Sequence, residues 1–364
     1  MFFITELMNK VGKADPRRDF KLGPWETHSR LMIVGDGNNW SLDWDGKELR
    51  GTCKHLKIPV MDSSFLFRSI DQSVFYTSRY DVLTNWQAPH HRIAFPYFHG
   101  KPGSGKGFDR MINMINLHHD EIHRIQVSHS EMHDLILETG IHSDKVFRIP
   151  IGINLDYFKW TTPELKKEAR EKLTIPQSAT VVGSFQKDGN GWGEGLEPKL
   201  IKGPDIFLKT VEILKDQVSE LFILLTGPAR GYVKNGLGKL GIPYTHKFLD
   251  DYTNIGLYYN ALDLYIVSSK EEGGPKAVLE SMASGIPLVT TRVGQAMDLV
   301  DHEENGWMVE PEDVEGLAHC AKVAINSTSS IAEILTRARQ TAENNAYSAL
   351  VPLWKEFMTG FVNY

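Results

Sequence analysis

The sequence predicts an α/β protein built from two domains with parallel sheets. Short apolar runs alternate with helical apolar periodicity along most of the chain. In addition, 364 residues are more than one hydrophobic core usually holds. A Pro-Ile-Gly-Ile-Asn segment at 150–154 interrupts the periodicity, so we expect a first domain over residues 1–153 and a second over 154–344.

Apolar runs in the first half predict strands, and the stretch 130–139 predicts a helix that Gly140 ends. The strands of this half are expected at 31–34, 73–76, 93–97, 124–127 and 146–149. In the second half we expect strands at 180–183, 221–226, 264–267 and 288–290, and helices at 163–172, 205–214, 256–260 and 276–284. A last amphipathic helix pattern covers 347–361, and a long glycine-rich loop covers 186–201.

Composition excludes several classes of protein. With 41% hydrophobic and 24% charged residues the chain is not expected to be disordered as a whole. It contains no run of about 18 or more apolar residues, so we expect no membrane-spanning helix. A net charge of -6 argues against nucleic acid as a partner. Cys53 and Cys320 lie far apart, so we expect neither a disulfide framework nor a cysteine zinc site. We expect a cytoplasmic protein, and a peripheral contact with the inner face of the membrane stays open.

The most informative segment follows the expected strand 264–267. Gly273 and Gly274 allow the backbone to turn there, and a helix is expected to begin near Lys276. The free N–H groups at the start of a helix can bind an anion. Glu272 and Glu280 flank this site, where carboxylates could hold the hydroxyls of a sugar and a ribose on either side of a diphosphate. The alternative is an ordinary turn with solvated acids.

This segment resembles the signature of the group 1 (family 4) glycosyltransferases, which has an acid, a Gly-rich loop and a second acid eight positions later. Further resembling segments follow the family's order, at 149–158, 224–230, 258–263 and 305–309. The resemblance covers about residues 120–320 and is weak before residue 90. It implies a GT-B fold, in which two Rossmann-like domains face each other across a cleft and a C-terminal helix, here about 345–364, returns to the first domain.

The resemblance also implies a function. The chain would be a retaining, metal-independent glycosyltransferase that moves a sugar from a UDP- or GDP-sugar to a hydroxyl of a growing glycan or glycolipid. The first domain would bind the acceptor and the second the donor, with no cofactor beyond this co-substrate. Glu280 would bind the ribose, and Glu272, as a catalytic residue, the transferred sugar. Backbone N–H groups of the segment would face the diphosphate, at Gly273, Gly274, Lys276 and Ala277.

Basic side chains should stabilise the diphosphate as it leaves. Lys202 matches the family's Lys-Gly pair and is expected to be catalytic. Ser184 stands where the family has an arginine, so Lys187 or Lys199 of the glycine-rich loop would supply the missing charge. Arg230, after a Gly-Pro turn, resembles a residue near the nucleotide. For the lysines and for Arg230 the alternative is an ordinary loop charge.

Candidates in the first domain follow two strands. His99 ends the strand at 93–97, and the resemblance puts it near the reacting centre; a hydrogen-bonded structural histidine is the alternative. Gly37 belongs to a glycine-rich loop that would approach the donor. Trp40, Asp43 and Trp44 could line an acceptor pocket, or they could pack a loop.

Other motifs suggest rival functions. Residues 100–107 nearly spell a P-loop, which would favour an NTPase or kinase, but Gly107 stands where a Ser or Thr must hold magnesium. His119 with His123, and His129 with His133, have a spacing that can bind zinc, yet the HExxH pattern is absent and no metal is expected. A non-catalytic nucleotide-sugar-binding module is the third alternative.

Overall fold

The computed structural model describes residues 28–35, 41–62, 72–78, 82, 91–249, 251–327 and 331–364. The chain divides into two compact units. The first comprises Met1–Val127, Met132–Ile149 and Val351–Tyr364, and the second comprises Ser128–Glu131 and Pro150–Leu350. The chain therefore leaves the first unit at Ile149 and returns to it at Val351.

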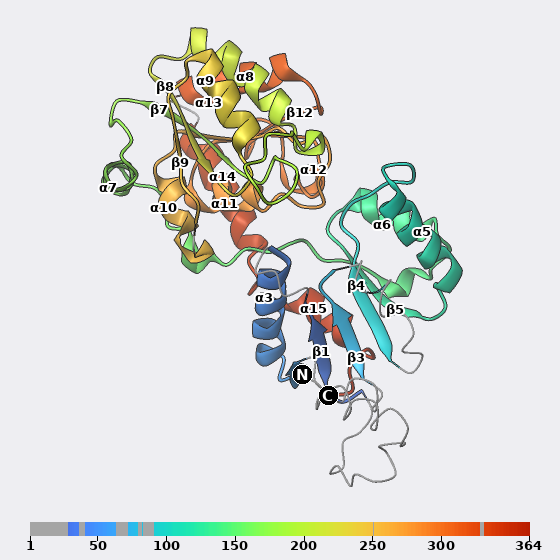
Figure 1. The fold of residues 1–364 in the computed structure, drawn as a ribbon. Coiled ribbons are helices and arrows are strands. Elements are labelled where there is room, and N and C mark those ends of the chain that lie inside the picture. The colour runs from blue at the N-terminus through green and yellow to red at the C-terminus, as the bar shows by residue number, and fades with distance from the viewer. Residues whose placement is uncertain are drawn as a thin grey trace, which may run out of the picture. The chain divides into compact units, whose positions relative to one another are not determined.

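A parallel sheet forms the centre of the first unit, with strand order β2-β1-β3-β4-β5-β6 in the described residues. Strands β1, β3, β4 and β5 of this sheet are labelled in Figure 1. Its strands are β1 (Leu31–Val34), β2 (Val60–Asp62), β3 (Ser73–Tyr76), β4 (Arg92–Pro96), β5 (Ile122–Val127) and β6 (Val146–Arg148). Its helices are α3 (Ser41–His55), α5 (Lys106–His118), α6 (Ser130–Leu137), the 3-10 helix η1 (Ser143–Lys145) and α15 (Val351–Met358).

Strand β3 has apolar side chains on both faces of the sheet, and helices cover both faces. Val74 and Tyr76 share a core with residues of α5 and α6. Phe75 points to the opposite face, where its ring meets Phe357 of α15 at 5.9 Å. Polar groups also tie the C-terminal residues to this unit. The Ser73 hydroxyl and Arg92 Nη1 both donate to the carbonyl of Phe361.

The second unit has a parallel sheet of order β12-β11-β10-β7-β8-β9 in the described residues. Its strands are β7 (Thr180–Phe185), β8 (Leu221–Thr226), β9 (Tyr244–His246), β10 (Leu264–Val267), β11 (Leu288–Thr291) and β12 (Trp307–Val309). Its helices are α7 (Pro163–Leu173), α8 (Pro204–Gln217), α9 (Gly231–Leu240), α10 (Ile255–Asn260), α11 (Lys276–Ser284), α12 (Ala296–Leu299), α13 (Val314–Asn326) and α14 (Ile331–Asn344). Its 3-10 helices are η2 (Leu155–Tyr157), η3 (Leu200–Lys202) and η4 (Tyr252–Asn254).

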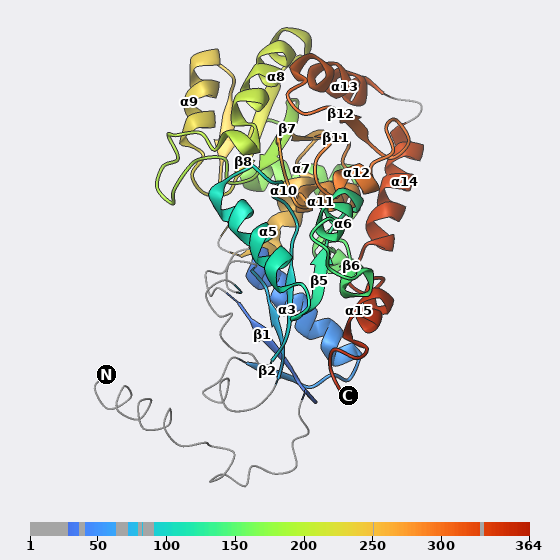
Figure 2. The ribbon, with the colours of Figure 1, turned by 90° about the vertical axis from the view of Figure 1, so that its right-hand side faces the viewer.

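Two separate apolar cores cover the faces of this second sheet. One contains residues of α8, α9 and α13, and the other contains residues of α7, α10, α11 and α14. Figure 2 shows α8, α9 and α13 grouped apart from α10, α11 and α14. The unit is therefore doubly wound, with its strands buried on both faces.

The order of the strands locates the place where a ligand can bind. The chain starts at β7, adds β8 and β9 on one side, and then crosses over to place β10, β11 and β12 on the other. The helices that follow the adjacent strands β7 and β10, α8 and α11, therefore lie on opposite faces of the sheet. In open parallel sheets such a switch point opens a crevice at the carboxyl ends of the strands.

The α/β fold with two parallel sheets is confirmed, and the ranges 221–226, 264–267 and 276–284 match β8, β10 and α11. The expected helix over 347–361 is wrong at both ends, since α15 covers only Val351–Met358. Ala346 instead forms a bridge with Ile153, and Tyr347 N–H donates to the Ile153 carbonyl. The helix α3 was not predicted. It contains Asp43 and Trp44, which are not in a loop.

Candidate functional site

The loops that follow β7 and β10 are pinned to each other. The Ser268 hydroxyl donates to the Gly203 carbonyl at 2.9 Å, and Lys270 N–H donates to the Ile201 carbonyl at 2.9 Å. Gly203 has a left-handed φ of 62°, and a Cβ there would lie 1.8 Å from the Ser268 carbonyl oxygen. Only glycine permits this approach, which brings Lys202 to the loop of Glu272.

Lys202 and Glu272 form an ion pair at this switch point. The Lys202 Nζ lies 2.5 Å from Oε1 of Glu272, and their side chains are 24% and 10% exposed. The Ser269 hydroxyl donates to the same Oε1 at 2.9 Å. The carboxylate is thus held in place by two donors, and a small part of its side chain stays exposed to solvent.

Glu280 lies one turn into α11, inside a tyrosine cluster. The Tyr252 hydroxyl donates to its Oε1, and the Tyr259 hydroxyl donates to Oε2 at 2.7 Å. Burial raises the pKa of the Glu280 carboxyl, while the two hydroxyls and the Lys276 ammonium oppose this rise. Burial and the nearby Glu280 carboxylate raise the pKa of Tyr259 far above its usual value, so this tyrosine stays a proton donor.

The start of α11 offers backbone donors to an anion. Pro275 is its N-cap, and no side chain of the described residues caps the helix there. The preceding turn is closely packed, because a Cβ on Gly274 would lie 2.7 Å from Ile151 Cδ1. The Gly273 carbonyl accepts from the Ser128 hydroxyl at 2.6 Å and from Gln295 N–H at 3.2 Å. Gly273, Gly274, Lys276 and Ala277 thus lie together beside Glu272.

The structure corrects the expectation for Arg230. Its side chain is fully buried, and its Nη1 donates to the carbonyls of Ser184, Gln186 and Thr226. Its Nη2 lies 3.0 Å from Oδ2 of Asp188, which is also buried. A guanidinium with this surrounding does not lie at a ligand surface, so Arg230 holds the ends of β7 and β8 together instead.

Lys187 and Lys199 lie in the inserted loop between β7 and η3. The Lys187 ammonium sits 3.8 Å from the ring centre of Trp192. Desolvation and the ammonium groups of Lys202 and Lys187 lower the pKa of Lys199, whereas Glu272 acts in the opposite direction. The charges of Lys187, Lys202 and Glu272 thus all act on Lys199.

The remaining candidates belong to the first unit. His99 follows β4 and is half-buried, with its ring 5.3 Å from that of Phe108. Trp44 lies in α3 with the Lys47 ammonium 4.1 Å from its ring centre. Asp43 lies in the same helix, and Gly37 and Trp40 lie outside the described residues.

The motifs behind the rival functions have other roles. In the P-loop-like segment, Gly103 N–H donates to the Asp109 carboxylate at 2.7 Å, so an acid takes a donor that a phosphate would need. Where the chain is described, His, Cys, Asp and Glu side chains do not gather in threes that could hold a metal ion. The described helices include none with the length and apolar character needed to cross a membrane.

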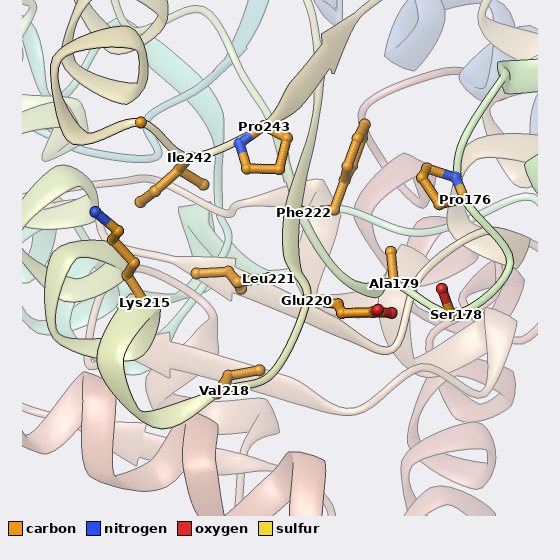
Figure 3. Close-up of a pocket in the computed structure, with 11 residues that line it drawn as sticks. Pro176, Ser178, Ala179, Lys215, Val218, Glu220, Leu221, Phe222, Ile242 and Pro243 are labelled. Atoms are coloured by element: carbon orange, nitrogen blue, oxygen red, sulfur yellow. The ribbon is translucent and has the colours of Figure 1, made fainter.

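A cavity of about 450 Å³ lies elsewhere on the second unit (Figure 3). It is lined by residues that precede or begin strands, such as Ala179 before β7, Leu221 at the start of β8 and Pro243 before β9. These are the amino ends of the strands. The cavity is thus at the opposite edge of the sheet from Lys202 and Glu272.

Several residues of the site were not predicted from the sequence. Tyr252, Ser128 and Asp188 contact predicted residues through their side chains, and Gln295 contacts Gly273 through its backbone N–H; all four come from distant segments. The only available signal was for Tyr259, which lies in the segment 258–263 that resembles the family. The other four carry no local pattern that distinguishes them.

The chain is similar in sequence and in fold to known proteins. Residues 195–327 match a family model described as "Glycosyl transferases group 1". An uncharacterized glycosyltransferase of Haemophilus influenzae is 27% identical over 157 residues, which is 42% of this chain and 44% of the relative. The lipopolysaccharide core biosynthesis mannosyltransferase LpsB of Rhizobium meliloti is 26% identical over 200 residues, 52% of this chain and 54% of the relative. The chain spans about half the length of these curated relatives.

Among solved structures, Anabaena HepE in complex with UDP and glucose is similar over 91% of this chain and 99% of its own, with a TM-score of 0.73 and 17% identity. This likeness shows the fold, which is that of the GT-B glycosyltransferases. It agrees with the two parallel sheets and with the return of α15 to the first unit. Residues 195–327 are therefore a group 1 glycosyltransferase domain, carried on a GT-B fold.

Proposed function

We propose that this protein transfers a sugar from a nucleoside-diphosphate sugar to a hydroxyl group of an acceptor, with retention of anomeric configuration. The observation that carries the proposal is the Lys202–Glu272 ion pair at the switch point, with Glu280 one turn into the adjoining helix. The mannosyltransferase LpsB and the UDP and glucose bound to HepE support a nucleotide-sugar donor.

Each group has a role in binding this donor. Glu280 accepts hydroxyls of the ribose, and Glu272 accepts hydroxyls of the transferred sugar. Lys202 and the N–H groups at the start of α11 face the diphosphate, where they stabilise the charge that develops as it leaves. These fixed cations let transfer proceed without a bound metal. The first unit holds the acceptor, with His99 and Trp44 as candidate contacts.

The chemical step uses no covalent intermediate on the enzyme. Both glutamates have hydroxyl-binding roles in this proposal, and donors already hold them in place, Lys202 at Glu272 and Tyr259 at Glu280. The bond between the anomeric carbon and the phosphate oxygen breaks, and the acceptor oxygen bonds to that carbon on the same face. The acceptor proton passes to the departing phosphate oxygen. A glycosyl-enzyme adduct trapped on the wild-type protein would contradict this step.

The acceptor is proposed to be a growing glycan or a glycolipid. LpsB is named for lipopolysaccharide core biosynthesis, and a further relative from Bacillus subtilis, 26% identical over 226 residues, is a putative teichuronic acid biosynthesis glycosyltransferase. Acceptors of this kind would place the protein at the cytoplasmic face of the membrane, where binding to liposomes in a flotation assay tests the contact.

Thermal unfolding against a nucleotide panel tests the donor. The panel contains UDP, GDP, ADP and their sugars, and ATP with and without magnesium. A ligand at about 100 times its Kd adds about 2.7 kcal/mol, enough to raise Tm by several degrees. We expect UDP or GDP to raise Tm without magnesium. A rise in Tm only with ATP and magnesium would contradict the proposal and favour a nucleoside triphosphatase.

Donor hydrolysis then separates an enzyme from a binding module. We expect the wild type to release UDP or GDP slowly from its sugar donor, and Glu272→Ala to lose this release while it still binds the free diphosphate. A wild type that binds the donor and releases nothing, with or without added acceptor sugars, would identify a non-catalytic binding module.

A further inference from the structure

The segment after β7 is an ordered hairpin. Lys199 N–H donates to the Asp188 carbonyl at 2.7 Å, and Asn190 N–H donates to the Glu197 carbonyl at 2.9 Å. Gly189 and Pro198 form an antiparallel bridge between them. Residues 188–199 are therefore a two-stranded hairpin, with Asp188 and Lys199 paired at its base.

The tip of this hairpin is fastened to the turn that follows β8. Gly231 N–H donates to the Glu194 carbonyl at 2.7 Å, and Tyr232 N–H donates to the Gly195 carbonyl at 2.8 Å. Gly195 has a φ of 71°, and a Cβ there would lie 2.1 Å from the Ala229 carbonyl oxygen. The hairpin is thus attached to residues 229–232 of the second unit, and this attachment requires glycine at position 195.

A buried ion pair holds the base of the hairpin. Arg230 Nη2 lies 3.0 Å from Asp188 Oδ2, and their side chains are 0% and 1% exposed. The same guanidinium donates to the carbonyls of Ser184 and Gln186, just before the hairpin. The charge of Asp188 is neutralised by this partner, so it does not cancel the charge of the neighbouring lysines.

Lysines flank this ion pair on both strands. Lys187 precedes Asp188 in the chain, and Lys199 is paired with Asp188 across the hairpin through its backbone. Lys199 is exposed, and its carbonyl accepts from the Lys202 N–H at 2.8 Å, which keeps the two lysines together. Since the Lys187 ammonium lies over the Trp192 ring, Lys199 is the better placed of the two to meet an anion beside Lys202.

We infer that the Asp188–Arg230 ion pair positions the hairpin so that Lys199 binds the diphosphate of the donor, in place of the arginine whose position Ser184 occupies. The inference rests on the proposed function. Asp188 and Arg230 are positioning residues, since they act through Lys199. A charge that is already in place when the diphosphate develops needs no reorganisation, which is why an anchored hairpin can replace an arginine on a strand.

A double-mutant cycle tests this inference by titration calorimetry with UDP, or with GDP if GDP gives the larger rise in Tm. Uridine or guanosine serves as the phosphate-free probe. We expect Lys199→Ala to raise the Kd of the diphosphate about tenfold and to leave the Kd of the nucleoside unchanged. Asp188→Asn should have a similar effect, and the double variant should be no weaker than either single one, because Asp188 acts through Lys199.

Glycine variants test the same positioning without touching the buried pair. Gly195→Ala should displace the hairpin and raise the Kd of the diphosphate, whereas Gly191→Ala is the matched control because its φ is also 71° and a Cβ there meets nothing within 4 Å. Lys199→Arg should restore most of the affinity that Lys199→Ala loses. These variants decide the inference even if Asp188→Asn does not fold.

The outcomes separate the inference from the proposed function. Three results would overturn the inference: additive losses of affinity in the double variant, an unchanged Kd in Lys199→Ala, or equal losses of affinity for the nucleoside and the diphosphate. In each case, binding of the diphosphate by the wild type would still uphold the proposed function. A wild type that binds neither UDP nor GDP would overturn both.

Discussion

The Nζ of Lys202 lies 2.5 Å from Oε1 of Glu272, although 70 positions of sequence separate the two residues. They meet because β7 and β10 are neighbours in the sheet while their helices turn away to opposite faces. The ion pair therefore lies at the point in the sheet where the strand order reverses. Under the proposed function, this is also where the diphosphate and the sugar of the donor would bind side by side.

Replacing Lys202 should slow transfer far more than it weakens folding. We expect Lys202→Met to lower kcat about 10²–10³-fold, by analogy with the removal of one preorganised donor from an oxyanion site. The measurement is the release of UDP or GDP from the sugar donor. Lys209→Met, an exposed lysine on α8, is the control and should keep wild-type kcat. A Lys202→Met enzyme within threefold of wild type would contradict the assigned role.

The two tyrosines on Glu280 should separate stability from binding. Tyr259 is fully buried, so Tyr259→Phe leaves a buried carboxylate oxygen without its donor and should lower the free energy of unfolding by about 1–3 kcal/mol. Tyr252 is only partly buried, so Tyr252→Phe should affect UDP affinity more than stability. Urea unfolding and UDP titration of both variants measure this, and the reverse pattern would refute it.

Gly203 should not tolerate a side chain. Gly203→Ala puts a Cβ 1.8 Å from the Ser268 carbonyl oxygen, so it should lower the free energy of unfolding by more than the strain of a left-handed residue, about 1–2 kcal/mol. Gly191→Ala isolates that strain, because its φ is 71° and nothing lies within 4 Å. Equal unfolding midpoints in urea for the two variants would show that the two loops are not pinned as described.

The ring of Phe357 should be the main attachment of α15 to the first unit. It is fully buried and contacts the rings of Phe75, Phe147 and Trp354. Phe357→Ala should lower the free energy of unfolding by about 3–5 kcal/mol, and Phe357→Leu by less. Leu353→Ala, 37% exposed on the same helix, is the control for chemical denaturation.

His123 should make the first unit less stable in mild acid. Burial and the nearby charges of Lys145, Arg92 and Arg124 lower the pKa of His123 to about 4, from an ordinary value of 6.5, although a backbone hydrogen bond at Glu121 opposes this. Above pH 6.5 the ring is neutral in both states. As the pH falls toward 4 the unfolded chain takes up the proton first, so stability falls by about 1–2 kcal/mol between pH 7 and 5.

Urea unfolding at pH 7 and pH 5 measures this linkage. The His123→Gln variant should lose less stability than the wild type over that interval. The control, His142→Gln, removes a highly exposed ring and should behave as the wild type does. Identical losses for wild type and His123→Gln would exclude His123 as the source of the acid sensitivity.

The parts of the fold that were predictable are those with strong local signals. The run at 221–226 is entirely apolar and entirely buried, and it forms a strand with those bounds. The helix at 276–284 ends where Gly285 takes a left-handed φ of 68°. The pattern of an acid on each side of this helix start also located the candidate site, because the ligand-facing edge of a parallel sheet follows from chain order alone.

What could not be predicted depends on partners far away in the chain. Arg230 looks like an ordinary loop charge until Asp188 and the carbonyl of Ser184 are brought around it. Tyr252 has no apolar period to mark it, yet it reaches Glu280 across 28 positions. The helix α3 is missed for a different reason. Its buried Leu49 and Cys53 are spaced as on a helix face, but the residues before them are mainly polar.

The return of α15 to the first unit has a consequence for synthesis of the protein. A ribosome must make all of the second unit, Pro150–Leu350, before it makes the helix that covers Phe75. During that interval the nascent first sheet lacks the cover over one apolar face, which is a condition that favours aggregation or chaperone binding. The second unit does not depend on a segment made much later, since almost all of it is one uninterrupted stretch of chain. It can therefore fold as it emerges from the ribosome.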